Sequence, residues 1–126
     1  MATWKEMSID NLGAARTLLQ VGRYRSSVCR AYYAAYCATT SEITKKTKTF
    51  ANEWNNPPHA HVPRLLKNHL NLTQTKIKLI IKKFRALHHA REDAEYRPGQ
   101  AIHAINARDC IRDSSTILFE LWGTDK

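Results

Sequence analysis

Apolar residues recur every three or four positions along most of the chain, a spacing that predicts helices separated by short breaks. The first expected helix begins near Ser8, with Ser8 or Asp10 as its cap, and ends at Gly22. The second runs from Tyr24 to about Lys46 and carries a stripe of small apolar residues. Because the break between these two helices is minimal, they are expected to lie antiparallel.

A polar segment separates these helices from the rest of the chain. Residues 45–58 combine lysines, paired asparagines and paired prolines, which is typical of an exposed loop. A short third helix follows with Pro63 near its first turn, and Thr73 caps a fourth. The fifth is expected over about residues 100–121, with Gly123 ending it. No strand pattern, Gly-rich phosphate loop or nucleophile elbow interrupts this series, so the chain is expected to be all-α.

The composition fits one globular domain. At 126 residues the chain is about one domain long, so a single domain is expected over residues 1–126. Its 43% hydrophobic and 25% charged residues match soluble proteins, and no apolar run approaches the roughly 20 residues that span a bilayer. The start of the chain lacks the apolar region of a signal peptide. We therefore expect a cytoplasmic protein with no membrane partner.

Neither the cysteines nor the histidines form a pattern typical of a metal site. Cys29, Cys37 and Cys110 are an odd number without a Cys-x-x-Cys pair, which argues against a disulfide framework and a zinc finger. They are expected to be reduced and mostly buried thiols. His59 and His61 have a spacing that suits a metal, but no nearby cysteine or carboxylate completes a ligand set. No metal or other cofactor is expected.

The net charge of +9 attracts polyanions such as nucleic acid, an acidic partner or an anionic membrane face, without choosing among them. Positive charge is densest on the expected fourth helix, at Lys76, Lys78, Lys82, Lys83 and Arg85. Both a solvated basic face and a face that contacts phosphates fit this pattern.

Tyrosines and alanines share one segment of the expected second helix, Arg30-Ala-Tyr-Tyr-Ala-Ala-Tyr36. The small alanines let another helix approach closely, while the phenol hydroxyls can reach polar partners. The periodicity alone favours a tight helix interface. The alternative is the lining of a polar cleft, in which Tyr32, Tyr33 or Tyr36 stacks on a base.

The densest set of titratable groups lies in residues 84–99, where the fourth helix runs into a charged turn that ends at Pro98 and Gly99. Two histidines, three arginines, three carboxylates and one tyrosine fall within these residues. The segment is therefore the main candidate for recognition or catalysis. In a purely structural alternative, Arg91 pairs with a nearby carboxylate and Tyr96 packs the turn.

Two segments together resemble the HEPN domain family, the higher eukaryote and prokaryote nucleotide-binding domains. The first is Gly22-Arg-Tyr-Arg followed by Ser-Ser-Val-Cys-Arg-Ala-Tyr-Tyr-Ala-Ala-Tyr36, and the second is Leu87-His-His-Ala-Arg-Glu-Asp-Ala-Glu-Tyr96. The resemblance spans about residues 8–121. It implies an up-and-down bundle of four to five helices, usually a homodimer. Such proteins occur in toxin–antitoxin pairs with minimal nucleotidyltransferases and in RNA-cutting defence systems.

Many members of this family are metal-independent ribonucleases, with an arginine, a polar residue and then a histidine where the last two long helices meet. By resemblance, Arg91 takes the arginine position and Glu92 the polar one. Tyr96 stands where the histidine is expected, and a phenol is a poor general base at neutral pH. An arginine and a histidine separated by the four to six intervening residues of this pattern also occur at Arg64 and His69 and at Arg97 and His103. The second pair lies just beyond the turn, which makes His103 a further candidate.

The sequence thus predicts two sets of site residues and leaves two functions open. The first function is an RNA- or nucleotide-associated protein of a toxin–antitoxin or defence system, with or without ribonuclease activity. The alternative is a non-catalytic dimerisation module that docks a partner nucleotidyltransferase, in which Tyr96 is a target for modification. The catalytic candidates are Arg91, Tyr96 and His103, and the nucleic-acid or nucleotide-binding candidates are Lys82, Lys83, Arg85, His88, Arg97 and Tyr33.

Overall fold

The computed structural model describes residues 1–47, 50 and 56–123, and within these ranges the chain forms helices and no strand. This confirms the expected all-α class. None of these helices combines the length and the apolar character that crossing a bilayer requires. The helices are α1 (Trp4–Gln20), α2 (Tyr24–Thr44), the 3₁₀ helix η2 (His59–His61), α3 (Val62–His69), α4 (Gln74–Tyr96) and α5 (Ala104–Trp122).

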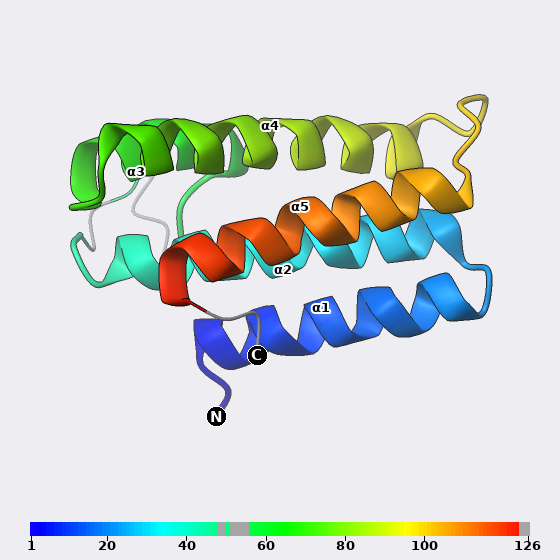
Figure 1. Cartoon of the computed structure of the whole chain (residues 1–126), viewed down its shortest axis with the longest axis horizontal. Coiled ribbons are helices and arrows are strands. Elements are labelled where there is room, and N and C mark those ends of the chain that lie inside the picture. Colours follow the sequence, from blue (N-terminus) through cyan, green and yellow to red (C-terminus); the bar gives the residue numbers. More distant parts are fainter. Residues whose placement is uncertain (48–49, 51–55, 124–126) are drawn as a thin grey trace.

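The four long helices alternate in direction and form an up-and-down bundle (Figure 1). Helix α2 is central, since it packs against α1, α4 and α5. The short helix α3 lies beside the N-terminal half of α4. The bundle expected from the sequence is confirmed.

The alanines of α2 allow this close packing. Ala31, Ala34 and Ala35 are fully buried, and they leave room for the neighbouring helices. Two buried hydroxyls also tie α1 to α2, because Ser8 Oγ donates to the Ala34 carbonyl at 2.6 Å and Ser27 Oγ to that of Ala15 at 2.7 Å. The helix-interface interpretation of this segment is therefore confirmed.

Helix α1 begins earlier than expected. The Thr3 hydroxyl accepts a hydrogen bond from the Glu6 backbone N–H at 3.1 Å, and the Glu6 carboxylate accepts one from the Thr3 N–H at 3.0 Å. This capping box starts the helix at Trp4. The expected cap at Ser8 or Asp10 is wrong, because both residues lie inside the helix.

The predicted start of α4 is confirmed, whereas that of α5 is wrong. Thr73 caps α4 as expected, since its hydroxyl accepts from the Lys76 N–H at 3.3 Å. The expected start of α5 at Gln100 is wrong, because α5 begins at Ala104. His103 has extended backbone there, and its N–H donates to Asn106 Oδ1 at 2.8 Å. The helix ends at Gly123, whose φ of +76° suits a residue without a side chain.

The cysteines are free thiols, with Cys37 and Cys110 buried and Cys29 half-buried. Burial raises the pKa of the Cys37 thiol to about 11 and that of Cys110 to about 12. Both thiols are therefore protonated at neutral pH. The expectation of reduced, mostly buried cysteines is confirmed.

Candidate functional site

Arg91 lies on α4 with its guanidinium against three tyrosine rings. The guanidinium carbon is 5.4 Å from the ring centroids of Tyr32 and Tyr33 and 5.5 Å from that of Tyr96. These distances are within the range of cation–π attraction. Tyr32 and Tyr33 come from α2, so the site is built where α2 and α4 pack together.

Polar groups hold the same guanidinium. Arg91 Nε lies 2.8 Å from Glu95 Oε2 without an aligned hydrogen bond, so this contact is an ion pair. Arg91 Nη2 donates to the Tyr96 hydroxyl at 3.2 Å. Burial acts to lower the pKa of Arg91, but Tyr33, Glu95, Tyr96 and Tyr32 outweigh it and raise that pKa. Arg91 is a permanent cation, and its side chain is 12% exposed.

His59 and His88 also pack against the tyrosines of α2 that lie beside Arg91. The Tyr32 hydroxyl shares a short hydrogen bond with His59 Nδ1, and the Tyr36 ring stacks on His59 with centroids 4.1 Å apart. The His88 ring centroid lies 5.5 Å from that of Tyr32. Burial, assisted by the charge of Arg91 and by His88, lowers the pKa of His59 to about 4. His59 is therefore neutral at neutral pH.

The position of His59 depends on the segment just before it. The Tyr36 hydroxyl donates to the Pro57 carbonyl at 2.6 Å and accepts from Asn56 Nδ2 at 2.8 Å. These bonds fix η2 against α2. We define the Arg91 cluster as the set that converges here from α2, η2 and α4: Tyr32, Tyr33, Tyr36, His59, His88, Arg91 and Tyr96.

Of the predicted site residues, the structure brings Tyr33, His88, Arg91 and Tyr96 together in this cluster. Tyr96 is also 60% exposed, so a ligand can reach it. None of the described contacts joins His103 to Arg91, and His103 instead flanks the start of α5.

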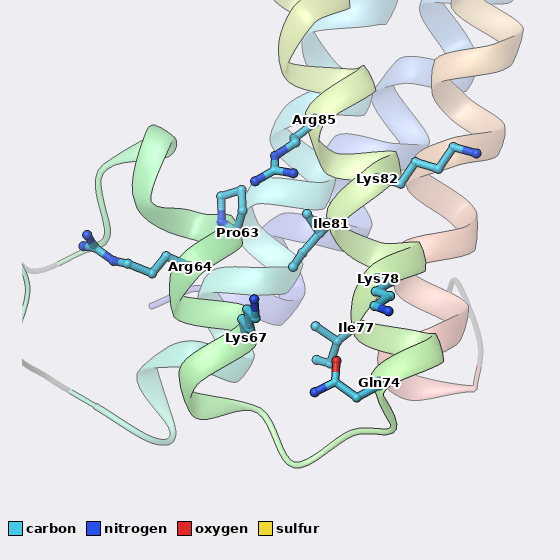
Figure 2. Close-up of a pocket in the computed structure, with 9 residues that line it drawn as sticks. All are labelled: Pro63, Arg64, Lys67, Gln74, Ile77, Lys78, Ile81, Lys82 and Arg85. Atoms are coloured by element: carbon cyan, nitrogen blue, oxygen red, sulfur yellow. The ribbon is translucent and has the colours of Figure 1, made fainter.

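The predicted basic residues are divided among other surfaces. Lys83 Nζ lies 3.1 Å from Asp113 Oδ1 on α5, and Arg97 Nη1 lies 3.0 Å from Asp93 Oδ1. Lys82 and Arg85 line a groove of about 620 Å³ between α3 and α4 (Figure 2). We call this the basic groove, and its lining residues are Pro63, Arg64, Lys67, Gln74, Ile77, Lys78, Ile81, Lys82 and Arg85.

Sequence reasoning missed two residues of this region. His59 was considered only with His61 as a metal ligand, and no local pattern links it to Tyr32. Among the described residues, no three His, Cys, Asp or Glu side chains gather as a metal-binding group. Arg25 entered only as part of the segment that carries the family resemblance and was given no role, although its guanidinium holds the turn after α4 by donating to several backbone carbonyls. The acceptors are the carbonyls of Asp93, Ala94, Arg97, Pro98 and Gln100.

A family model, the HEPN domain, matches residues 1–121 and so covers nearly the whole chain. The chain belongs to the HEPN domain family. The all-helical fold agrees with this membership, and the family supports an RNA- or nucleotide-associated function for the protein. No curated protein and no solved structure gave a significant match.

Proposed function

We propose that this HEPN protein binds RNA or nucleotide at the Arg91 cluster. The observation that carries the proposal is the packing of one permanent cation against three phenol rings at the junction of α2 and α4. A guanidinium suits phosphate oxygens because its donors form a planar fork. Of the rings in the same place, Tyr96 is exposed and Tyr33 is half-buried, so these two can stack on bases, whereas Tyr32 is fully buried.

A second arginine extends this surface. The guanidinium carbon of Arg30 lies 5.0 Å from the ring centroid of Tyr33, whose ring Arg91 also contacts. Arg30 and Glu95 line a shallow hollow of about 580 Å³ between the start of α2 and the end of α4. A phosphate next to Arg91 would therefore have a second cation within the same surface.

Binding can be measured by fluorescence anisotropy with a labelled single-stranded RNA and with labelled AMP. Replacing a charge-assisted phosphate contact is worth about 1.5–3 kcal/mol, so Arg91→Ala should weaken binding at least tenfold. Arg91→Lys keeps the charge and most of the packing but loses the fork, so it should restore only part of the affinity. Arg112→Ala, on the exposed face of α5, is the control. Equal affinity of the wild type and Arg91→Ala would overturn the proposal.

Metal-independent RNA cleavage is a second candidate function, and the convergence of His59 and His88 near Arg91 favours it. Cleavage needs a base for the 2′-hydroxyl, a proton donor for the leaving oxygen and a cation for the phosphorane. Arg91 supplies the cation. The neutral His59 ring can accept a proton, but its lowered pKa makes it a weak base at neutral pH. His88 lies one helical turn from Arg91 and is the candidate donor.

The test of cleavage is incubation of the protein with RNA in EDTA. Cleavage that is lost in His88→Ala and in Arg91→Ala would support the ribonuclease function. If the wild type binds RNA and leaves it intact, the protein is a binding protein only. His103→Ala should behave like the wild type in both assays, because His103 lies at the start of α5.

Docking of a partner protein, as in a toxin–antitoxin pair, is favoured by the turn after α4. Arg25 holds this turn through backbone carbonyls, so the exposed Tyr96 and Arg97 are presented on a fixed surface. Co-purification with the product of a neighbouring reading frame, lost in Arg97→Glu, would support docking.

A homodimer is also expected, and light scattering should then give a mass near twice the 14.5 kDa of one chain.

A further inference from the structure

The basic groove between α3 and α4 is separate from the Arg91 cluster and has unusual charge. Of the described residues that line it, five are cationic and none is acidic: Arg64, Lys67, Lys78, Lys82 and Arg85. Within the described part of the chain, none of the five has a carboxylate partner. By contrast, Lys83 on the same helix pairs with Asp113. The groove therefore concentrates positive charge that no carboxylate of the described residues pairs with.

The floor of the groove is aliphatic. Ile77 and Ile81 point from α4 toward α3, and Pro63 lies opposite them, next to Arg85 (Figure 2). Among the described residues, no aromatic side chain lines the groove. A ligand here would place its anionic groups at the rim and apolar edges on the floor, without stacking on a ring. This combination suits the sugar-phosphate backbone of a nucleic acid more than its bases.

Three cations of the groove form a row along α4. Lys78, Lys82 and Arg85 are four and three residues apart, so they follow each other at about 6 Å and about 4.5 Å along the helix axis. The Arg85 side chain extends toward Pro63, whereas that of Lys82 extends away from α3 (Figure 2). Successive phosphates of one strand can meet such a row. A volume of about 620 Å³ is in the range of a small-ligand site and can hold a segment of one strand.

The groove also leads toward the Arg91 cluster. Arg85 at the end of the groove and His88 in the cluster are neighbours one turn apart on α4. On the other wall, α3 directly follows η2, which carries His59. A strand whose bases reach the tyrosines can thus continue between α3 and α4.

We propose that the basic groove holds the backbone of single-stranded RNA and extends the binding surface beyond the Arg91 cluster. This inference rests on the proposed function, because it assigns a second part of the same ligand. From Lys78 to Arg91 the helix rises about 20 Å, which is about six nucleotides at 3.4 Å each in a stacked strand. Affinity should therefore rise with RNA length up to about six nucleotides and then level off.

The experiment compares two double variants that remove the same charge. Lys82→Gln/Arg85→Gln removes two cations of the groove, and Arg108→Gln/Arg112→Gln removes two from the exposed face of α5. Anisotropy is measured with a labelled twelve-nucleotide single-stranded RNA and with labelled AMP over a range of salt concentrations. Thermal unfolding by circular dichroism shows that each variant is folded.

The groove variant should bind the RNA at least fivefold more weakly, with the slope of log K against log salt reduced by about 1.4, which is 0.7 for each lost contact. Its affinity for AMP should be unchanged, because the Arg91 cluster is intact. The α5 variant should stay within about twofold of the wild type for both ligands.

Four results would overturn the inference. If the wild type binds RNA and the groove variant binds it equally well, the groove does not hold the RNA backbone, while the proposed function at the Arg91 cluster stands. If both double variants lose affinity equally, the effect is one of net charge. If a twelve-residue poly-glutamate peptide displaces the RNA as well as unlabelled RNA does, the groove is a protein-docking site. A wild type that binds neither RNA nor AMP would overturn both the proposed function and this inference.

Discussion

Among single residues, Glu95 has the most direct effect on what Arg91 can bind. Its carboxylate lies 2.8 Å from Arg91 Nε and competes with a phosphate for the same guanidinium. Glu95→Gln should therefore tighten RNA binding by about two- to fivefold, since pairs of this kind are worth about 0.2–1 kcal/mol. Anisotropy checks this, with Glu120→Gln on α5 as a control of equal charge change. A weaker Glu95→Gln complex would show that the carboxylate assists binding.

Arg25 is the second residue with a distinct expected effect. Its guanidinium donates to carbonyls at the end of α4 and in the following turn, among them Ala94 at 3.0 Å and Pro98 at 3.2 Å. Arg25→Ala leaves these acceptors without their donor and should lower the free energy of unfolding by about 2 kcal/mol. Urea denaturation measures this loss. Arg25→Lys should recover less than half of it, because a single ammonium group cannot reach all the carbonyls to which the two guanidinium nitrogens donate. Unchanged stability of Arg25→Ala would contradict this role.

His59 should make stability depend on pH. Its folded pKa of about 4 is below the ordinary 6.5, so the unfolded chain binds the proton more readily. The contribution of the neutral His59 ring to the free energy of unfolding is complete above about pH 6.5 and is lost as the pH falls toward 4. It reflects the surroundings of the ring, which are Tyr32, Tyr33 and Tyr36 on α2 and His88, Arg91, Glu92 and Glu95 on α4.

Melting temperatures between pH 7 and 4.5 test this expectation. His59→Gln should show a smaller decrease than the wild type over the upper part of this range, where carboxylates are still ionised. His61→Gln is the matched control, because it removes a histidine of the same 3₁₀ helix that lies outside the cluster. Identical pH profiles for the wild type and His59→Gln would show that His59 does not titrate as described.

For the helices, the start of α1 gives the clearest expectation. Thr3 supplies the capping box with Glu6, so Thr3→Ala should cost about 1 kcal/mol and increase amide exchange in the first turn. Thr3→Ser keeps the hydroxyl and should behave like the wild type. Exchange that is unchanged in Thr3→Ala would show that packing of α1 on α2 fixes this end without the cap.

How far each helix could be predicted depends on how local its signals are. The core stripe of α4 and its Thr73 cap are visible in the sequence, and so is the left-handed glycine after α5. The Thr-x-x-Glu signal at Thr3 is also present in the sequence. It was not used, because the helix start was placed from the apolar periodicity, which begins near Ser8. The start of α5 was placed too early because the turn after Pro98 extends to His103.

The candidate site was only partly predictable, for a different reason. Arg91 and Tyr96 lie within one segment, so their proximity follows from the helix. The contact of His59 with Tyr32 spans 27 residues, and the bonds of Arg25 span 68–75. Such contacts depend on how the helices pack, and a single sequence carries no periodic signal for them.

The whole molecule has a strongly positive net charge and belongs to a family that is associated with RNA or nucleotides. Some of its cations pair with carboxylates at the surface, as at Lys83 with Asp113 and Arg112 with Asp109. The basic groove gathers five cations in one place, and none of them has such a partner in the described residues. Net charge alone would attract any polyanion, whereas this distribution favours the α3–α4 side of the bundle.

The most direct test of RNA binding at the Arg91 cluster is photo-crosslinking of the intact protein to single-stranded RNA that contains 4-thiouridine, followed by mass spectrometry of the peptides. We expect crosslinks to Tyr33 and Tyr96, and their loss in Arg91→Ala while that variant remains folded. Crosslinks confined to α1 or α5, or an unchanged pattern in Arg91→Ala, would contradict the account.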